Sequence, residues 1–204
     1  MNLTPDQWRS APDAGLHNFI IHFIDGKTDD GGLSFDEHAL HFLCDSPSSE
    51  TVASCLNFES VVKYILATSP YKVKSIIRWT DGTSKQYKNV GNVGFEKYIA
   101  LKYDLYVIHS FFVTCWGKGK IDLLGGIVHR LYAALVAILL ERASNLSLVC
   151  RELTNRYKIP GSTSVESSLS TRLFFYVSLD SNKSAKESRT TWRSLNFATG
   201  VLFS

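Results

Sequence analysis

The chain has 204 residues, of which 45% are apolar and 20% charged, and its formal net charge is +3. This composition is typical of a globular protein with enough apolar side chains for a core, and it excludes a disordered or collagen-like chain. The length favours one domain, or one domain with an extension. The longest apolar run, Leu131 to Leu140, has ten residues. A bilayer-spanning helix needs about 20, so we expect no membrane partner.

The first residues and the cysteines indicate an intracellular protein. Met1 to Asp13 is polar and contains two prolines, unlike a signal peptide. The four cysteines are scattered, and none forms a C-x-x-C pair, which suits neither a zinc ribbon nor a disulfide framework. Reduced thiols are therefore expected.

Turn residues and apolar periodicity divide the chain into alternating elements. In chain order, we predict strands at 17–24 and 39–44, a helix at 51–67, a strand at 73–79, a helix at 91–103, a strand at 105–114, helices at 125–143 and 148–157, and a strand at 172–179. We expect Asp25-Gly26 to be a turn and Gly125-Gly126 to open the longest helix. This order is that of an α/β layered domain with a mixed central sheet flanked by helices.

The strand at 73–79 is predicted to be the central strand of that sheet. Ile76 and Ile77 are consecutive apolar residues that point to opposite faces, as in a strand covered on both sides. Its expected neighbours are the strands at 39–44 and 105–114.

Charge is distributed unevenly along the chain. Residues 1–71 contain ten acidic residues against three basic ones, whereas residues 72–130 contain ten basic against four acidic. A basic segment of this kind is expected on a phosphate-facing surface, although a solvated lysine face explains it almost as well.

Two aspartates follow strand-like runs within this basic segment. Asp81 precedes Gly82 at the end of the run that contains Trp79, and Asp122 lies in a glycine-rich stretch after the run 105–113. A rigid strand end can present a metal-binding carboxylate, and a neighbouring glycine lets a phosphate approach. Each motif, taken alone, is also compatible with a simple turn or loop.

The sequence from Trp79 to Asn89 (W-T-D-G-T-S-K-Q-Y-K-N), with the block from Phe111 to Arg130, resembles a group of eukaryotic transposon-derived proteins. The resemblance covers about residues 35 to 178. It implies the ribonuclease H-like domain of DDE-type transposases and integrases, in which three carboxylates hold two Mg or Mn ions. It also implies a core at 35–180, an N-terminal remnant with one strand at 1–34, DNA as the partner and a nuclear location. The serine- and lysine-rich composition of the last residues predicts a mobile basic tail at 181–204.

The resemblance assigns roles to particular residues. Asp81 would be the second carboxylate, and Asp122 is the candidate for the third, with Glu141 as the alternative. The expected phosphate contacts are Lys85, Lys88, Lys118, Lys120 and Arg130.

The chain also departs from the family pattern. The block with the first carboxylate does not occur, so the first edge strand is expected to be missing, and Trp116 stands where the family has histidine. The sequence therefore predicts a transposase-derived fragment that is inactive as it stands. The alternatives are a non-catalytic DNA- or protein-binding module and a protein whose apolar helix at 123–143 forms a homo-oligomer.

Overall fold

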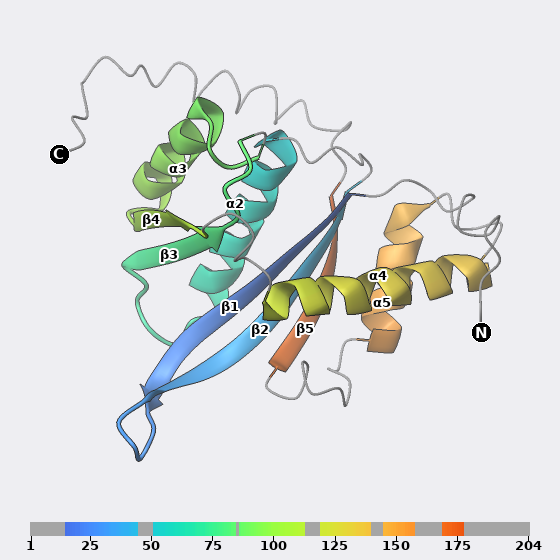
Figure 1. Ribbon diagram of the computed structural model, residues 1–204, viewed down its shortest axis with the longest axis horizontal. Helices are drawn as coiled ribbons and strands as arrows, with labels where there is room; N and C mark the ends of the chain where they lie inside the picture. Colours follow the sequence, from blue (N-terminus) through green and yellow to red (C-terminus); the bar gives the residue numbers. More distant parts are fainter. Residues whose placement is uncertain are drawn as a thin grey trace. The chain divides into compact units, whose positions relative to one another are not determined.

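The computed structural model describes residues 15–44, 51–84, 86–112, 119–139, 145–157 and 169–177. These residues form strands and helices of a mixed α/β protein, which confirms the predicted class (Figure 1). The chain divides into two compact units, and each is described by itself. Unit 1 contains residues 1–48 and 118–178, and unit 2 contains residues 49–117 and 179–204.

The sheet of unit 1 has the strand order β1-β2-β5. Strand β1 (Gly15–Lys27) runs antiparallel to β2 (Leu33–Cys44), and β5 (Leu169–Val177) runs parallel to β2. The β1–β2 ladder crosses the boundary predicted at residue 34. On one face of the sheet, the ring of Phe42 contacts the rings of Phe19 and Phe175.

The predicted Asp25-Gly26 turn is wrong. Both residues belong to β1, and the register with β2 shifts between Ile24 and Gly26, as at a β-bulge. The chain turns later, where the amide of Thr28 donates to the carbonyl of Gly32 at 2.9 Å and Gly31 adopts a φ of 82°. Only glycine adopts that φ readily, so the turn forms there.

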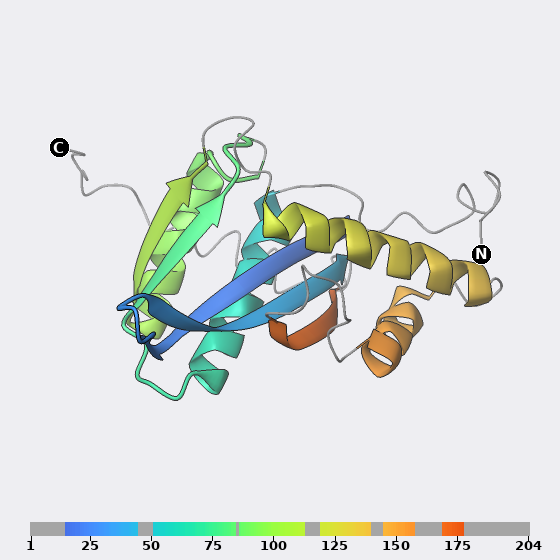
Figure 2. The same cartoon turned by 60° about the horizontal axis from the view of Figure 1, so that its bottom comes forward.

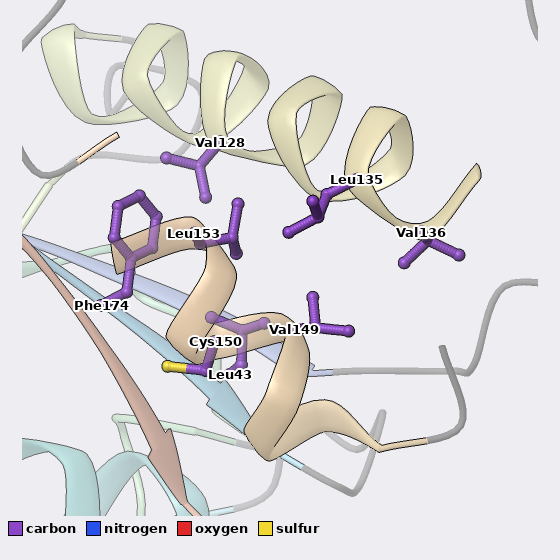
Figure 3. Close-up of a cluster of buried hydrophobic side chains, with 8 residues drawn as sticks. All are labelled: Leu43, Val128, Leu135, Val136, Val149, Cys150, Leu153 and Phe174. Atoms are coloured by element: carbon purple, nitrogen blue, oxygen red, sulfur yellow. The ribbon is translucent and has the colours of Figure 1, made fainter. Parts of the chain in front are cut away.

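Helices α4 (Lys120–Leu139) and α5 (Leu146–Tyr157) pack on the other face of this sheet. Figure 3 shows side chains from both helices meeting residues of β2 and β5 in one apolar cluster. Its buried members are Leu43, Val128, Leu135, Val136, Val149, Cys150, Leu153 and Phe174. Because α4 begins at Lys120, Gly125 and Gly126 lie inside the helix and do not open it.

Within the described part of the chain, α4 from Lys120 to Ile138 is long and apolar enough to cross a membrane, judged by length and composition alone. The uncharged run considered in the sequence starts at Leu131. The helix begins at Lys120 and so is longer than that run. Of the segment from Lys120 to Ile138, 28% is buried, including Val128 and Leu135 in the apolar cluster of unit 1.

Unit 2 is built on two parallel strands, β3 (Ser75–Thr80) and β4 (Tyr106–Phe111). Helix α2 (Thr51–Thr68) precedes β3, and α3 (Val90–Tyr103) connects it to β4. Both helices lie on the same face of the strand pair (Figures 1 and 2), and Arg78 of β3 contacts side chains of each. These elements agree with the predicted ones to within a few residues.

The prediction that the strand at 73–79 is central is wrong for the described residues, because β3 lies in a two-stranded sheet, and only one of its two expected neighbours is confirmed. Strand β3 pairs with β4 as expected, but residues 39–44 of β2 pair with β1 and β5 instead. Burial on both faces is also wrong, since Ile76 is buried whereas Ile77 is 62% exposed. Within unit 2 the helices cover one face of the strands, so burial alternates along β3.

Candidate nucleic-acid interface

Asp81 lies directly after the last residue of β3, as the sequence predicted. Its side chain is exposed, and its Oδ1 accepts a hydrogen bond from the amide of Thr83 at 3.3 Å. The carbonyl of Thr83 then accepts from the amides of Gln86, Tyr87 and Lys88 at 2.8–3.3 Å. The loop after β3 is therefore folded around one carbonyl group, at the carboxyl edge of two parallel strands. Ligands commonly bind at this edge in α/β proteins.

Lys88 returns to the start of the same loop. Its side chain lies over Gly82, where an added Cβ would come within 2.7 Å of Nζ. Nζ also lies 4.9 Å from the centre of the Phe111 ring, at the end of β4. Gly82 is therefore the residue that lets the ammonium group approach the backbone beside Asp81.

The amino terminus of α3 lies at the end of this loop. The Asn89 side chain caps the helix by accepting from the amide of Asn92 at 2.9 Å, and its Nδ2 donates to the carbonyl of Ser84 at 3.0 Å. A helix amino terminus carries a partial positive charge, which favours an anion nearby. This dipole and Lys88 make the edge attractive to phosphate, while Asp81 adds one negative charge.

A buried network of charged side chains lies between the two strands and the helices of unit 2. Oε1 of Glu96 accepts from Arg78 Nη1 at 2.9 Å and from Asn92 Nδ2 at 3.1 Å, and it lies 2.7 Å from His109 Nδ1. The side chains of Arg78, Glu96 and His109 are 5%, 11% and 7% exposed. The Arg78 guanidinium also donates to Ser54 and lies 4.3 Å from the centre of the Phe58 ring. This network fixes β3, β4 and both helices together.

The second predicted carboxylate, Asp122, lies in the first turn of α4. Its Oδ2 accepts from the amide of Gly119 at 3.1 Å, and its own amide donates to the Gly119 carbonyl at 3.1 Å. The Asp122 carboxylate therefore caps the first turn of the helix, beside a backbone turn bond. Asp122 belongs to unit 1 and Asp81 to unit 2, so the predicted close pair of carboxylates stays a prediction.

The predicted phosphate contacts are distributed over both units. Lys120 makes a close ion pair with Glu37 of β2, and Arg130 is exposed on α4. Lys88 is the one described member of the set that lies in unit 2 beside Asp81. Lys85, Lys118, Trp116 and Glu141 lie outside the described residues.

The described residues do not fit a divalent metal centre by themselves. In these parts of the chain, no three His, Cys, Asp or Glu side chains come together as metal ligands. The Glu96 carboxylate of the network in unit 2 already contacts Arg78 and His109 through its Oε1. Mg²⁺ is usually held by one or two carboxylates with substrate phosphates completing its shell. An ion held here by Asp81 would therefore depend on its substrate for most of its ligands.

Sequence reasoning missed the network of Arg78, Glu96 and His109. The available signal was a charged residue inside an apolar strand, since Arg78 interrupts the run of β3 and needs a partner when buried. Nothing in the sequence indicated which acid that partner would be.

A sequence family described as a domain of unknown function (DUF8701) matches residues 7–189. No curated protein and no solved structure matches the chain.

Proposed function

The chain belongs to the DUF8701 family, and we propose that it is a transposase-derived, ribonuclease H-like domain that binds nucleic acid without cleaving it. The observation that carries the proposal is the carboxyl edge of β3 and β4, where Asp81, Lys88 and the amino terminus of α3 meet. The resemblance of residues 79–89 and 111–130 to DDE-type transposases supports the same assignment, with a nuclear location.

Binding is the activity that these residues support best. Phosphate contacts need positive charge and exposed donors, and Lys88 is an exposed lysine at the edge. Strand cleavage by the two-metal mechanism needs several carboxylates around paired ions, whereas Asp81 is the single exposed carboxylate in the described part of this edge. Mg or Mn would be needed only if further carboxylates join it.

The test is binding of the full chain to a labelled DNA duplex at several salt concentrations. We expect a dissociation constant on the order of 10⁻⁴–10⁻⁶ M that rises steeply with salt. Lys88→Gln should weaken binding and lower the slope of log K against log salt by about 1. Lys74→Gln is the matched control, because Lys74 is exposed just before β3, at the opposite end of the strand.

Three results would overturn the proposal. The first is absence of binding at low salt, and the second is equal effects of Lys88→Gln and Lys74→Gln. The third is nicking of plasmid DNA with Mg²⁺ or Mn²⁺ that disappears in Asp81→Ala, because this would show an active nuclease.

A second candidate function, a protein-binding module, is favoured by the face of β3 and β4 that the helices of unit 2 do not cover. This face carries large exposed apolar side chains: Ile77, Trp79, Tyr106, Ile108 and Phe112. Clustered apolar exposure of this kind marks protein interfaces.

Leu123 and Ile138 of α4 are exposed in unit 1, which keeps the predicted homo-oligomer contact as a proposal. Sedimentation of the full chain at rising concentration tests for such an assembly.

A further inference from the structure

Two side chains, those of His109 and Thr80, connect the buried carboxylate of Glu96 to the backbone of Asp81. Glu96 Oε1 lies 2.7 Å from His109 Nδ1, and His109 Nε2 lies 2.7 Å from Thr80 Oγ1. The Thr80 hydroxyl is also placed to donate to the carbonyl oxygen of Asp81, at 3.0 Å. All four residues belong to unit 2, and His109 stands opposite Arg78 in the parallel register of β3 and β4.

The Thr80 hydroxyl has one proton and two acceptors within reach. When His109 is neutral and keeps its proton on Nδ1 toward Glu96, Nε2 is an acceptor, and the hydroxyl donates to it. When His109 is protonated, Nε2 becomes a donor to Thr80 Oγ1. The hydroxyl proton is then directed to the carbonyl of Asp81. The protonation state of a buried ring therefore decides whether the Asp81-Gly82 peptide is held.

We propose that His109 is a positioning residue for Asp81 and acts through the Thr80 hydroxyl. The protonated ring fixes the Asp81-Gly82 peptide at the carboxyl edge of β3, and the neutral ring releases it. The proposal rests on the proposed function only in treating this edge as the binding site. The coupling itself is a property of the free protein.

Several groups face the ring from the elements around it. The Glu96 carboxylate of α3 contacts the ring, and the Arg78 guanidinium of β3 contacts the same carboxylate. From the loop, the Tyr87 ring meets His109 edge-on, and burial raises the pKa of its hydroxyl. Lys88 lies over Phe111, whose ring is 4.2 Å from that of His109. Among the described residues, Asn92 lies against the ring, while Ser54 and Phe58 contact Arg78, and all three are uncharged.

The experiment is an NMR titration of the isotope-labelled full chain without nucleic acid. The ring resonances of His109 report its protonation, while the carbonyl ¹³C of Asp81 and the amide ¹⁵N of Gly82 report the hydrogen bond to their shared peptide. We expect both sets to change with the same midpoint. The measurement is repeated in Asp81→Asn. This variant has no carboxyl group at position 81, so a change in the peptide resonances cannot come from that group.

Thr80→Val, which is close in shape but lacks the hydroxyl, should leave the His109 titration visible and remove the step from the Asp81-Gly82 peptide. Thr80→Ser should restore it, and His109→Gln should abolish it. Thr80→Ser and His109→Gln test the proposal even if Thr80→Val does not fold. A flat Asp81 carbonyl in the natural chain, or an unchanged step in Thr80→Val or His109→Gln, overturns the proposal.

The same samples separate this inference from the proposed function. A coupled titration with no DNA binding would refute the nucleic-acid interface and leave the positioning role of His109 intact. DNA binding without the coupled titration would do the reverse. If both hold, the affinity of the natural chain for DNA should change through the His109 titration, and this pH dependence should be lost in Thr80→Val.

Discussion

Replacement of Glu96 by glutamine should destabilise unit 2 strongly. The variant keeps the size of the side chain but removes the negative charge that Arg78 and His109 contact at 2.9 and 2.7 Å. Removing one partner of a buried ion pair typically costs about 3–5 kcal/mol, because the other charge stays buried without compensation. Arg78 retains its contacts with Ser54 and Asn92, so we expect about 3 kcal/mol, at the lower end of that range.

Urea unfolding followed by circular dichroism, with hydrogen exchange at the amides of β3 and β4, measures this loss. Lys63→Gln is the control. Lys63 pairs with Glu59 on the exposed side of α2, and its side chain is 62% exposed. Loss of such a surface pair should cost about 0.5 kcal/mol or less. If Glu96→Gln costs no more than Lys63→Gln, the network does not stabilise unit 2. An additive double-mutant cycle of Glu96→Gln with Arg78→Met would also refute the argument, because directly paired residues should couple.

Two further predictions concern unit 1. Gly126→Ala should raise the free energy of unfolding by about 0.5–1 kcal/mol through helix propensity, because the nearest atom, Nη1 of Arg130, is 3.8 Å from the added Cβ. In the same urea unfolding experiment, Gly125→Ala should raise the free energy of unfolding less, or lower it, because its Cβ would come within 3.0 Å of Asn18 Nδ2. Burial, with the nearby Arg172 charge, lowers the pKa of His41 from 6.5 to about 3. The folded chain then binds fewer protons than the unfolded one, so stability present above pH 6.5 should fall by up to about 1.4 kcal/mol per pH unit toward pH 3. If the free energy of unfolding of His41→Gln fell with pH at the same slope as that of the natural chain, the prediction would be wrong.

The helices and strands could be predicted because their signals are local. Proline and serine residues limit α2, and the Asn89 cap lies directly before α3. The errors also have local causes. Asp25-Gly26 has the composition of a turn but forms a bulge, and the glycines of α4 lie inside a helix that buries Leu124 and Val128. Tertiary packing outweighs glycine's low helix propensity there.

The arrangement of the strands could not be predicted in the same way. The consecutive residues Ile76 and Ile77 suggested a strand covered on both faces. A strand covered by helices on one face only can have the same sequence. The partners of Arg78 come from positions 14 to 24 residues away, in two different helices. Of the candidate site, Asp81 could be located from the sequence because its place depends on the end of one strand.

The late position of β5 in the chain affects how the protein is made. Ser170 of β5 hydrogen-bonds to Asp36 of β2, 134 positions earlier. At about 5–20 residues per second, the ribosome leaves that edge of β2 without its partner for roughly 7–27 s. Unpaired strand edges of apolar sequence attract other chains. Meanwhile residues 51–112 have emerged and can fold. The yield of soluble protein should therefore depend on elongation speed and on chaperones that shield β2 until residue 177 appears.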